Sequence, residues 1–181
     1  MPAPVKRLLR AALLTSFLGT TPVLGAAAPV AAAPSPSVAT VTATTSTTAA
    51  SMARTILVLM NRDRVARGLR ALVGESRLGS LAAARAAWMA SHNNMSHTSA
   101  GGTLSSAMRS RGIRASWAGE CIGWTNATWG STSARWLYTA WKHSPEHWGL
   151  MMSSRFTKVG IGFAYRSSNR ETFGSLVFAR L

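Results

Sequence analysis

Two imidazoles and one carboxylate are the side chains of this sequence best suited to chemistry. The chain has four histidines and only five acidic residues. His97, Glu120 and His147 each lie close to glycine, proline or serine, where a polar side chain can face a cleft. Two imidazoles and a carboxylate could bind zinc with one open position, or hold a water molecule by hydrogen bonds. The alternative is that each residue is a separate structural hydrogen-bonding group beneath a loop.

A second pattern involves a proline between two histidines. The segment from His143 to His147 (HSPEH) matches the H-x-x-E-H pattern of one metallopeptidase group, whose histidines share a helical face. A continuous helix through Pro145 would lose a backbone hydrogen bond and suffer a clash, at a cost of roughly 3 kcal/mol. We therefore expect the two histidines to lie on different elements, which argues against a metallopeptidase. The sequence also lacks a G-x-S-x-G elbow, a phosphate-cradling Gly-Lys loop and Cys/His zinc spacing.

The remaining acidic residues and the cysteine have structural interpretations. Glu75 and Glu171 fall in expected loops and are interpreted as solvated, and Asp63 lies among arginines as an ion-pair partner. Cys121 is the only cysteine, so the chain has no internal disulfide. We expect Cys121 to be a small, buried apolar residue, with a reactive or bridging thiol as the alternative.

The helices that must position these groups follow from apolar residues at helical spacing. Helices are expected over about 51–68, 80–91, 103–112 and 132–144, with a short helix from Pro145 through Met152. Gly68 and Gly112 suit the left-handed position after a helix, and Ile113 could contact Met108 in a Schellman cap. Pro145 ends one helix and starts the next, because proline lacks the N–H that a helix interior requires.

Extended segments are expected over 117–124, which carries Glu120, and over 159–165 and 172–180, which are joined by a loop at 166–171. In the second of these segments bulky residues alternate with Gly160 and Gly162, so one face is bare and a helix can approach it closely. Helices followed by a strand hairpin predict an α+β fold with an antiparallel sheet sandwiched between helices.

The first 50 residues differ from the rest of the chain. Residues 1–28 have the pattern of a signal peptide: basic residues, a short apolar run and small residues at a cleavage site. The run is too short and too broken to span a bilayer, and a retained amphipathic anchor is the alternative. Residues 29–50 contain no charged and no aromatic residue, which predicts a disordered linker rich in Ala, Pro and Thr. We expect a secreted protein with one folded domain at 51–181, no transmembrane segment after processing, and a monomeric state.

The charge of the chain is strongly positive, at +15. Without the three basic residues in the first ten positions, 17 basic residues face five acidic ones, a net charge near +12. Such a charge attracts anionic wall polymers, acidic lipids or glycans, although a merely solvated basic surface is the alternative. No nucleic-acid motif accompanies the charge, so nucleic acid is not expected as a partner.

Five short motifs in order resemble the CAP superfamily, which comprises cysteine-rich secretory proteins, antigen 5 and pathogenesis-related 1 proteins. The resemblance covers about residues 54–181, is closest to short bacterial exported members, and implies an α-β-α sandwich. The motifs are Asn61-x-x-Arg64-x-x-x-Gly68-Leu69, Ser96-His97-Thr98, Gly119-Glu120-x-Ile122, Trp141-x-x-Ser144-Pro145-x-His147 and Phe156-Thr-x-Val-Gly-Ile-Gly162.

In that family a central cleft is lined by two histidines and two acidic residues, which in some members bind zinc or another divalent ion. The resemblance implies that His97 and His147 are the two histidines and that Glu120 is the acid of the family's G-E-N motif.

The sequence departs from the family pattern at three positions. Cys121 stands where Asn is usual, Glu146 replaces the Gly before the second histidine, and Ser144 stands where the second acid is expected. The set of four is therefore incomplete unless Glu146 turns into the cleft.

Most family members have no established enzymatic activity, so the resemblance implies a secreted, non-catalytic binding module whose His/Glu-lined cleft holds a ligand or divalent metal. One alternative is a metal-dependent hydrolase that uses a zinc-bound water with Glu120 as the base. The missing fourth polar residue and the lack of an obvious oxyanion donor oppose it. A further alternative is a cationic wall- or membrane-binding protein that acts through its arginines.

Overall fold

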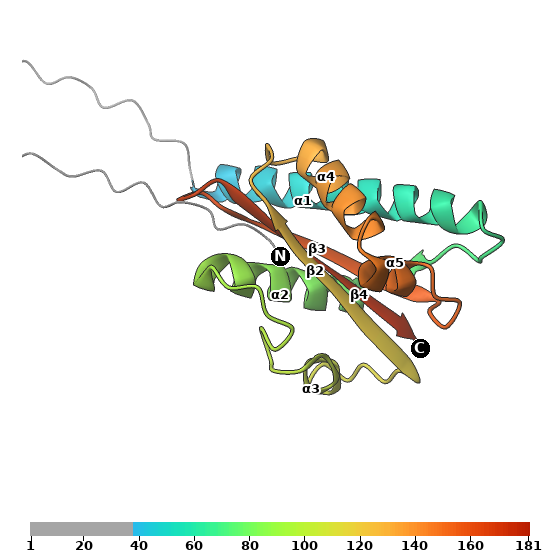
Figure 1. Ribbon diagram of the computed structural model, residues 1–181. Coiled ribbons are helices and arrows are strands. Elements are labelled where there is room, and N and C mark those ends of the chain that lie inside the picture. The colour runs from blue at the N-terminus through green and yellow to red at the C-terminus, as the bar shows by residue number, and fades with distance from the viewer. Residues whose placement is uncertain (1–37) are drawn as a thin grey trace, which may run out of the picture. The chain divides into compact units, whose positions relative to one another are not determined.

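The structure is a computed structural model that describes residues 38–181. The expected signal peptide at 1–28 and residues 29–37 of the expected linker lie outside this range. Figure 1 shows the elements, which in chain order are α1 (Val38–Val65), β1 (Val73–Gly74), α2 (Ser76–His92), α3 (Leu104–Arg109), β2 (Trp117–Thr125), α4 (Ser131–Lys142), α5 (Pro145–Met151), β3 (Lys158–Arg166) and β4 (Glu171–Arg180).

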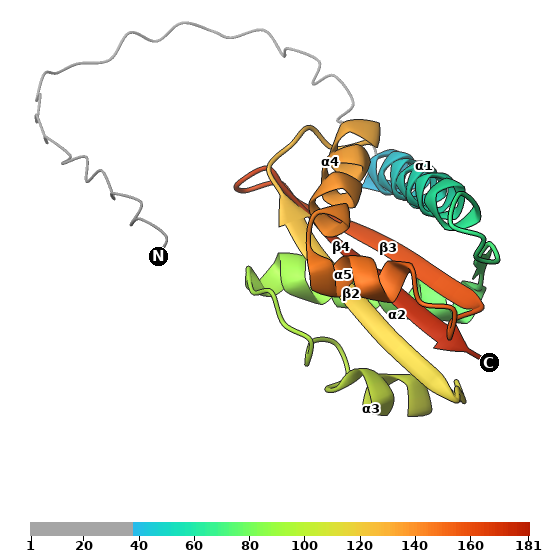
Figure 2. The same ribbon diagram turned by 45° about the vertical axis from the view of Figure 1, so that its right-hand side comes forward.

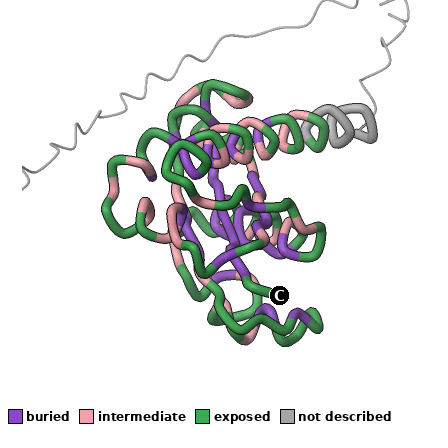
Figure 3. Tube along the Cα trace, turned by 90° about the vertical axis from the view of Figure 1, so that its right-hand side faces the viewer, coloured by how far each residue is buried: buried purple, intermediate pink, exposed green. Residues whose placement is uncertain are grey.

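The strands form one sheet in the order β1-β3-β4-β2. The long strands β3, β4 and β2 pair antiparallel, and the two-residue strand β1, which was not expected, pairs parallel with β3. Helices α1, α4 and α5 cover one face of the sheet, and α2 covers the other (Figure 2). The expected α+β fold with a sheet between helices is therefore confirmed. The buried residues concentrate in the sheet and on the helix faces that meet it (Figure 3).

Helix α2 packs directly on the bare face of β3. A Cβ atom added to Gly160 would lie 1.9 Å from the carbonyl carbon of Leu78, and one added to Gly162 would lie 2.1 Å from the backbone nitrogen of Ala83. No side chain fits into so small a gap, so the two glycines set the distance between helix and strand. The expectation that a helix approaches this face is confirmed.

Helix α1 begins earlier than expected, at Val38 instead of Ser51. The expectation of an unstructured linker is therefore wrong for residues 38–50, which are helical. The chain has no proline or glycine between positions 37 and 67, and Ala49 and Ala53 pack against the core. Once a helix is anchored by such packing, each further residue adds a backbone hydrogen bond, so the helix extends toward its N-terminus.

The ends of two helices follow the glycine pattern. Gly68 and Gly112 adopt left-handed φ angles of 71° and 65°. In the second case the backbone N–H of Ile113 donates to the carbonyl of Met108 at 2.9 Å, and both side chains are buried in one cluster. This is the expected Schellman arrangement.

The start of α2 lies four residues before the expected one because of Glu75. Its carboxylate accepts a hydrogen bond from the backbone N–H of Leu78 at 2.7 Å, and it also pairs with Arg77 at 3.0 Å. Glu75 thus caps the helix, and its interpretation as a solvated loop residue is wrong.

Candidate functional site

Glu120 lies in the middle of β2, with its side chain on the face of the sheet that α2 covers. Only 7% of Glu120 is exposed. Arg85 on α2 is fully buried and meets the carboxylate with two nitrogens: Nε donates to Oε1, and Nη2 donates to Oε2 at 3.1 Å. The two residues form a bidentate ion pair away from water, the geometry in which an arginine holds a carboxylate most firmly.

Two further donors complete the surroundings of Glu120. The hydroxyl of Ser175 on β4 donates to Oε1 at 3.1 Å, and Nδ1 of His97 donates to Oε2 at 2.9 Å. An ionised carboxylate offers about four lone-pair positions, and here four donors occupy them. Glu120 therefore has no lone pair left for a metal ion or for taking a proton from a substrate.

Arg85 also holds the loop that carries His97. Its remaining N–H groups donate to three backbone carbonyls, those of His97, Ser99 (2.7 Å) and Gly102 (3.2 Å). The guanidinium thus fixes the loop and the carboxylate together. Arg85 was not among the expected site residues, although its position between Leu81 and Met89 on the apolar stripe of α2 was a signal that it is buried.

His97 projects from this loop with 60% of its side chain exposed. Because its Nδ1 is engaged by Glu120, the other ring nitrogen, Nε2, is the one left for an outside ligand. A histidine oriented by a carboxylate through one nitrogen is the usual arrangement for a histidine that binds through the other.

His147 has a similar arrangement on α5. Its Nδ1 is 2.9 Å from the hydroxyl oxygen of Ser144, which leaves its Nε2 for a ligand. His143 is the residue after α4 and its Nδ1 bonds to the carbonyl of Thr139, so the two histidines of the HSPEH segment lie on different elements, as expected.

The two imidazoles reach the same edge of the sheet from opposite faces. β2 is an edge strand, Glu120 faces α2, and the next side chain, Cys121, faces α5 with its Sγ 3.8 Å from the carbonyl oxygen of His147. Burial lowers the pKa of His147, the Glu146 carboxylate raises it, and His97 lowers it, with a net lowering. The lowered pKa favours the neutral ring of His147, which can act as an acceptor.

The other two residues near the expected site have different roles. Glu146 is exposed, and its carboxylate acts on His147 through its charge. Cys121 is fully buried and free, and burial, followed by the charge of Glu120, raises the pKa of its thiol. The expectation of a buried apolar residue at position 121 is confirmed, and the raised pKa makes this thiol unreactive.

The side chains at this site are too few to form a zinc site. Zinc in proteins is held by three or four side chains. Within residues 38–181, no group of three or more His, Cys, Asp or Glu side chains is placed to hold a metal ion. Glu120, which was expected to be the third ligand, directs its lone pairs to Arg85, Ser175 and His97. Each of the two histidines instead uses Nδ1 for a protein partner, and the Glu120 carboxylate orients the ring of His97.

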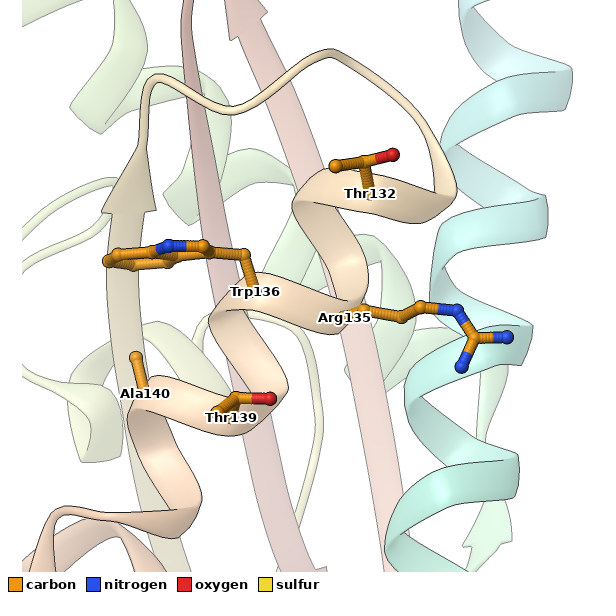
Figure 4. Close-up of a pocket in the computed structure, with 5 residues that line it drawn as sticks. All are labelled: Thr132, Arg135, Trp136, Thr139 and Ala140. Atoms are coloured by element: carbon orange, nitrogen blue, oxygen red, sulfur yellow. The ribbon is translucent and has the colours of Figure 1, made fainter.

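One cavity lies away from these residues, on the outer surface of α4. It has a volume of about 500 Å³ and is lined by Thr132, Arg135, Trp136, Thr139 and Ala140. Figure 4 shows that the side chains of Arg135 and Trp136 extend to opposite sides of the helix. One helix alone lines it, so it is an open hollow and not the His/Glu-lined cleft expected from the sequence.

Two acidic residues differ from their expected surroundings. Asp63 is an ion-pair partner as expected, but a buried one: it pairs with Lys142 of α4 and accepts a hydrogen bond of 2.7 Å from the Tyr138 hydroxyl. Glu171 begins β4, and its Oε2 atom is buried without a hydrogen-bond partner in the described structure, so its interpretation as a solvated loop residue is wrong.

Within residues 38–181 no helix combines the length and apolar character needed to cross a bilayer.

Comparisons with known proteins agree with this fold. The model of the CAP family, described as the cysteine-rich secretory protein family, matches residues 57–178. No curated protein matches the chain in sequence. Among solved structures, an extracellular protein with an SCP domain from Bacillus anthracis is similar with a TM-score of 0.63 and 23% identity over 74% of this chain.

Two further bacterial structures have the same fold. An outer surface protein of Borrelia burgdorferi has a TM-score of 0.60 and 16% identity, with 68% of this chain and 88% of that chain covered. A cysteine-rich secretory protein of Staphylococcus aureus has a TM-score of 0.59 and 15% identity over 74% of this chain. The match spans only 41% of the Bacillus protein and 39% of the Staphylococcus protein. The family model covers most of the chain, and the chain therefore belongs to the CAP, or cysteine-rich secretory protein, family.

Proposed function

We propose that the protein is an exported binding module that holds a hydroxyl-bearing ligand, such as a wall glycan, between His97 and His147 without chemical turnover. Each imidazole uses Nδ1 for a protein partner, so the pair presents two Nε2 atoms. In a neutral imidazole, Nε2 accepts a hydrogen bond when Nδ1 carries the proton and donates one otherwise, and the hydroxyl groups of a sugar can do both. The extracellular and outer-surface proteins with this fold support export.

The proposal depends on one observation: protein donors occupy all the hydrogen-bond acceptor positions of the Glu120 carboxylate. A general base needs a free lone pair within reach of the proton it removes. All four acceptor positions of Glu120 are directed to protein donors, with the guanidinium of Arg85 as counter-ion. This supports a structural role for the carboxylate and binding by the imidazoles, in preference to a hydrolase in which Glu120 activates a water molecule.

The pairing of the imidazoles can be tested with zinc as a probe, because zinc seeks neutral imidazole nitrogen. The chain offers a matched control, since its other two histidines, His92 and His143, are exposed and bonded to carbonyls of their own helices. Zinc should bind weakly to the wild type in calorimetry. The zinc affinity should fall at least about tenfold in the His97→Ala/His147→Ala variant. It should equal that of the wild type in the His92→Ala/His143→Ala control.

Ligand binding is tested by sedimentation of the same variants with purified bacterial cell walls. At a salt concentration that screens the positive charge of the chain, we expect the wild type and the His92→Ala/His143→Ala control to sediment with the walls, and the His97→Ala/His147→Ala variant to stay in solution. Equal sedimentation of both double variants would contradict the proposed site. Release of soluble sugar from the walls by the wild type, but not by Glu120→Gln, would contradict the absence of turnover.

A further inference from the structure

A second cavity, of about 560 Å³, lies where α1 ends and β3 begins. Its walls come from the last turn of α1, the segment leading into β1, the segment between α5 and β3, and the end of β4. Neither His97 nor His147 lines it, so it is independent of the function proposed above.

The innermost wall of this cavity contains Arg64, of which only 1% is exposed. Its Nε donates to the carbonyl of Arg70 at 2.9 Å, and its Nη1 donates to the carbonyls of Met151 (2.7 Å) and Ser153 (3.0 Å). These acceptors are neutral, and Nη2 donates to no group within residues 38–181. Burial lowers the pKa of the guanidinium.

Three more cations line the same cavity: Arg70, Lys158 and Arg180. None of them forms an ion pair with an acidic side chain in the described part of the chain. The chain has only five acidic residues, all of them described, and none lines the cavity. The nearest in sequence are Asp63 and Glu75. Asp63 pairs with Lys142 and accepts a hydrogen bond from the Tyr138 hydroxyl. Glu75 is engaged by Arg77 and by the N–H of Leu78. Four positively charged side chains therefore share one hollow that no acidic side chain lines.

We propose that this cavity binds a phosphate-bearing ligand. A phosphate group carries up to two negative charges and several acceptor oxygens, which matches a set of guanidinium and ammonium donors better than a single carboxylate does. The hydroxyls of Ser154 and Thr157 also line the cavity and can donate to the same oxygens. Leu69 and Phe156 supply apolar wall for the organic part of the ligand.

The test uses two probes, because a phosphate group can belong to a soluble ester or to a lipid headgroup. The first probe is inorganic phosphate, titrated at constant ionic strength and followed by calorimetry. The second is vesicles of phosphatidylcholine with and without phosphatidylglycerol. The test variant is the double substitution Lys158→Gln/Arg180→Gln. The side chains of Lys158 and Arg180 form no hydrogen bond with the described residues, so their replacement removes charge without removing a structural contact. The control Arg54→Gln/Arg109→Gln removes two charges from other parts of the surface, and circular dichroism checks that each variant is folded.

We expect saturable phosphate binding that weakens at least about tenfold in Lys158→Gln/Arg180→Gln and is unchanged in the control. The variant Lys158→Arg/Arg180→Lys keeps both positive charges. Phosphate binding that is retained in this variant would support a site that depends on charge. Vesicle binding that depends on phosphatidylglycerol and on the same two residues identifies a lipid headgroup, whereas phosphate binding without vesicle binding identifies a soluble ester. Absence of saturable binding to both probes, or an equal loss in the control, would overturn the proposal.

Discussion

Arg85 and Glu120 are 35 positions apart in the chain and form a buried ion pair in which two guanidinium nitrogens meet the two carboxylate oxygens. The same arginine binds the carbonyls of the loop that carries His97, and the same carboxylate orients the ring of His97. The position of His97 therefore depends on a charge pair beneath it. Glu120 is therefore a positioning residue for the ring of His97.

The first prediction concerns the titration of His147. Burial lowers its pKa, the Glu146 carboxylate raises it and His97 lowers it. We expect an NMR titration to give a pKa below the ordinary value of 6.5. Glu146→Gln should lower the pKa further, because it removes the contribution that raises it, and His97→Ala should raise it. Glu171→Gln on β4 serves as a control that leaves it unchanged.

The lowered pKa has a consequence for stability. In the pH range between 6.5 and the lower folded value, the unfolded chain binds more protons at position 147 than the folded chain does. The contribution of this residue to the free energy of unfolding is therefore complete above pH 6.5 and is lost as the pH falls through that range. A His147 pKa above 6.5 in the folded protein would contradict the described surroundings.

The second prediction concerns the contact between α2 and β3. Gly160→Ala would place a Cβ atom 1.9 Å from the backbone of Leu78, so helix and strand must separate. We expect a loss of about 3 kcal/mol of unfolding free energy, at the upper end of the usual cost of overpacking, measured by urea denaturation. Gly149→Ala is the control, because no atom lies within 4 Å of an added Cβ there, and it should stabilise α5 by about 0.5–1 kcal/mol. Equal denaturation midpoints for Gly160→Ala and wild type would contradict this packing.

The third prediction concerns the link between α1 and α4. The Tyr138 hydroxyl donates to buried Asp63 at 2.7 Å, while the chain's other tyrosine, Tyr165, is 37% exposed. Tyr138→Phe removes one of the donors to a buried carboxylate and should lower the unfolding free energy by about 1–3 kcal/mol. Tyr165→Phe should change it by less than about 0.5 kcal/mol. Similar losses in the two variants would mean that the Tyr138 hydrogen bond is not formed.

The features that the sequence predicted are those with local causes. Gly68 and Gly112 end helices because a left-handed residue is needed there, and Pro145 separates two helices because it lacks an N–H. Gly160 and Gly162 indicated a close helix contact because their spacing leaves one face of a strand bare.

The features that it did not predict depend on partners distant in the chain or on competing tendencies. Arg85 is buried only because Glu120 and three loop carbonyls meet it, and none of these partners is a sequence neighbour. The start of α1 at Val38 depends on core packing near Ala49, whereas the local composition, rich in threonine, favours no helix. The metal ligands expected at His97 and His147 stay a prediction.

The role of Glu120 as the structural counter-ion of Arg85 can be measured by a double-mutant cycle with Glu120→Gln, Arg85→Gln and both changes. The quantity compared is the free energy of unfolding in urea. Removal of one partner of a buried pair leaves an uncompensated charge and typically costs 3–5 kcal/mol. We predict a loss of about 3 kcal/mol or more for Glu120→Gln and a coupling energy of about 1–3 kcal/mol between the two positions. Unchanged stability of Glu120→Gln together with a coupling energy near zero would contradict this role.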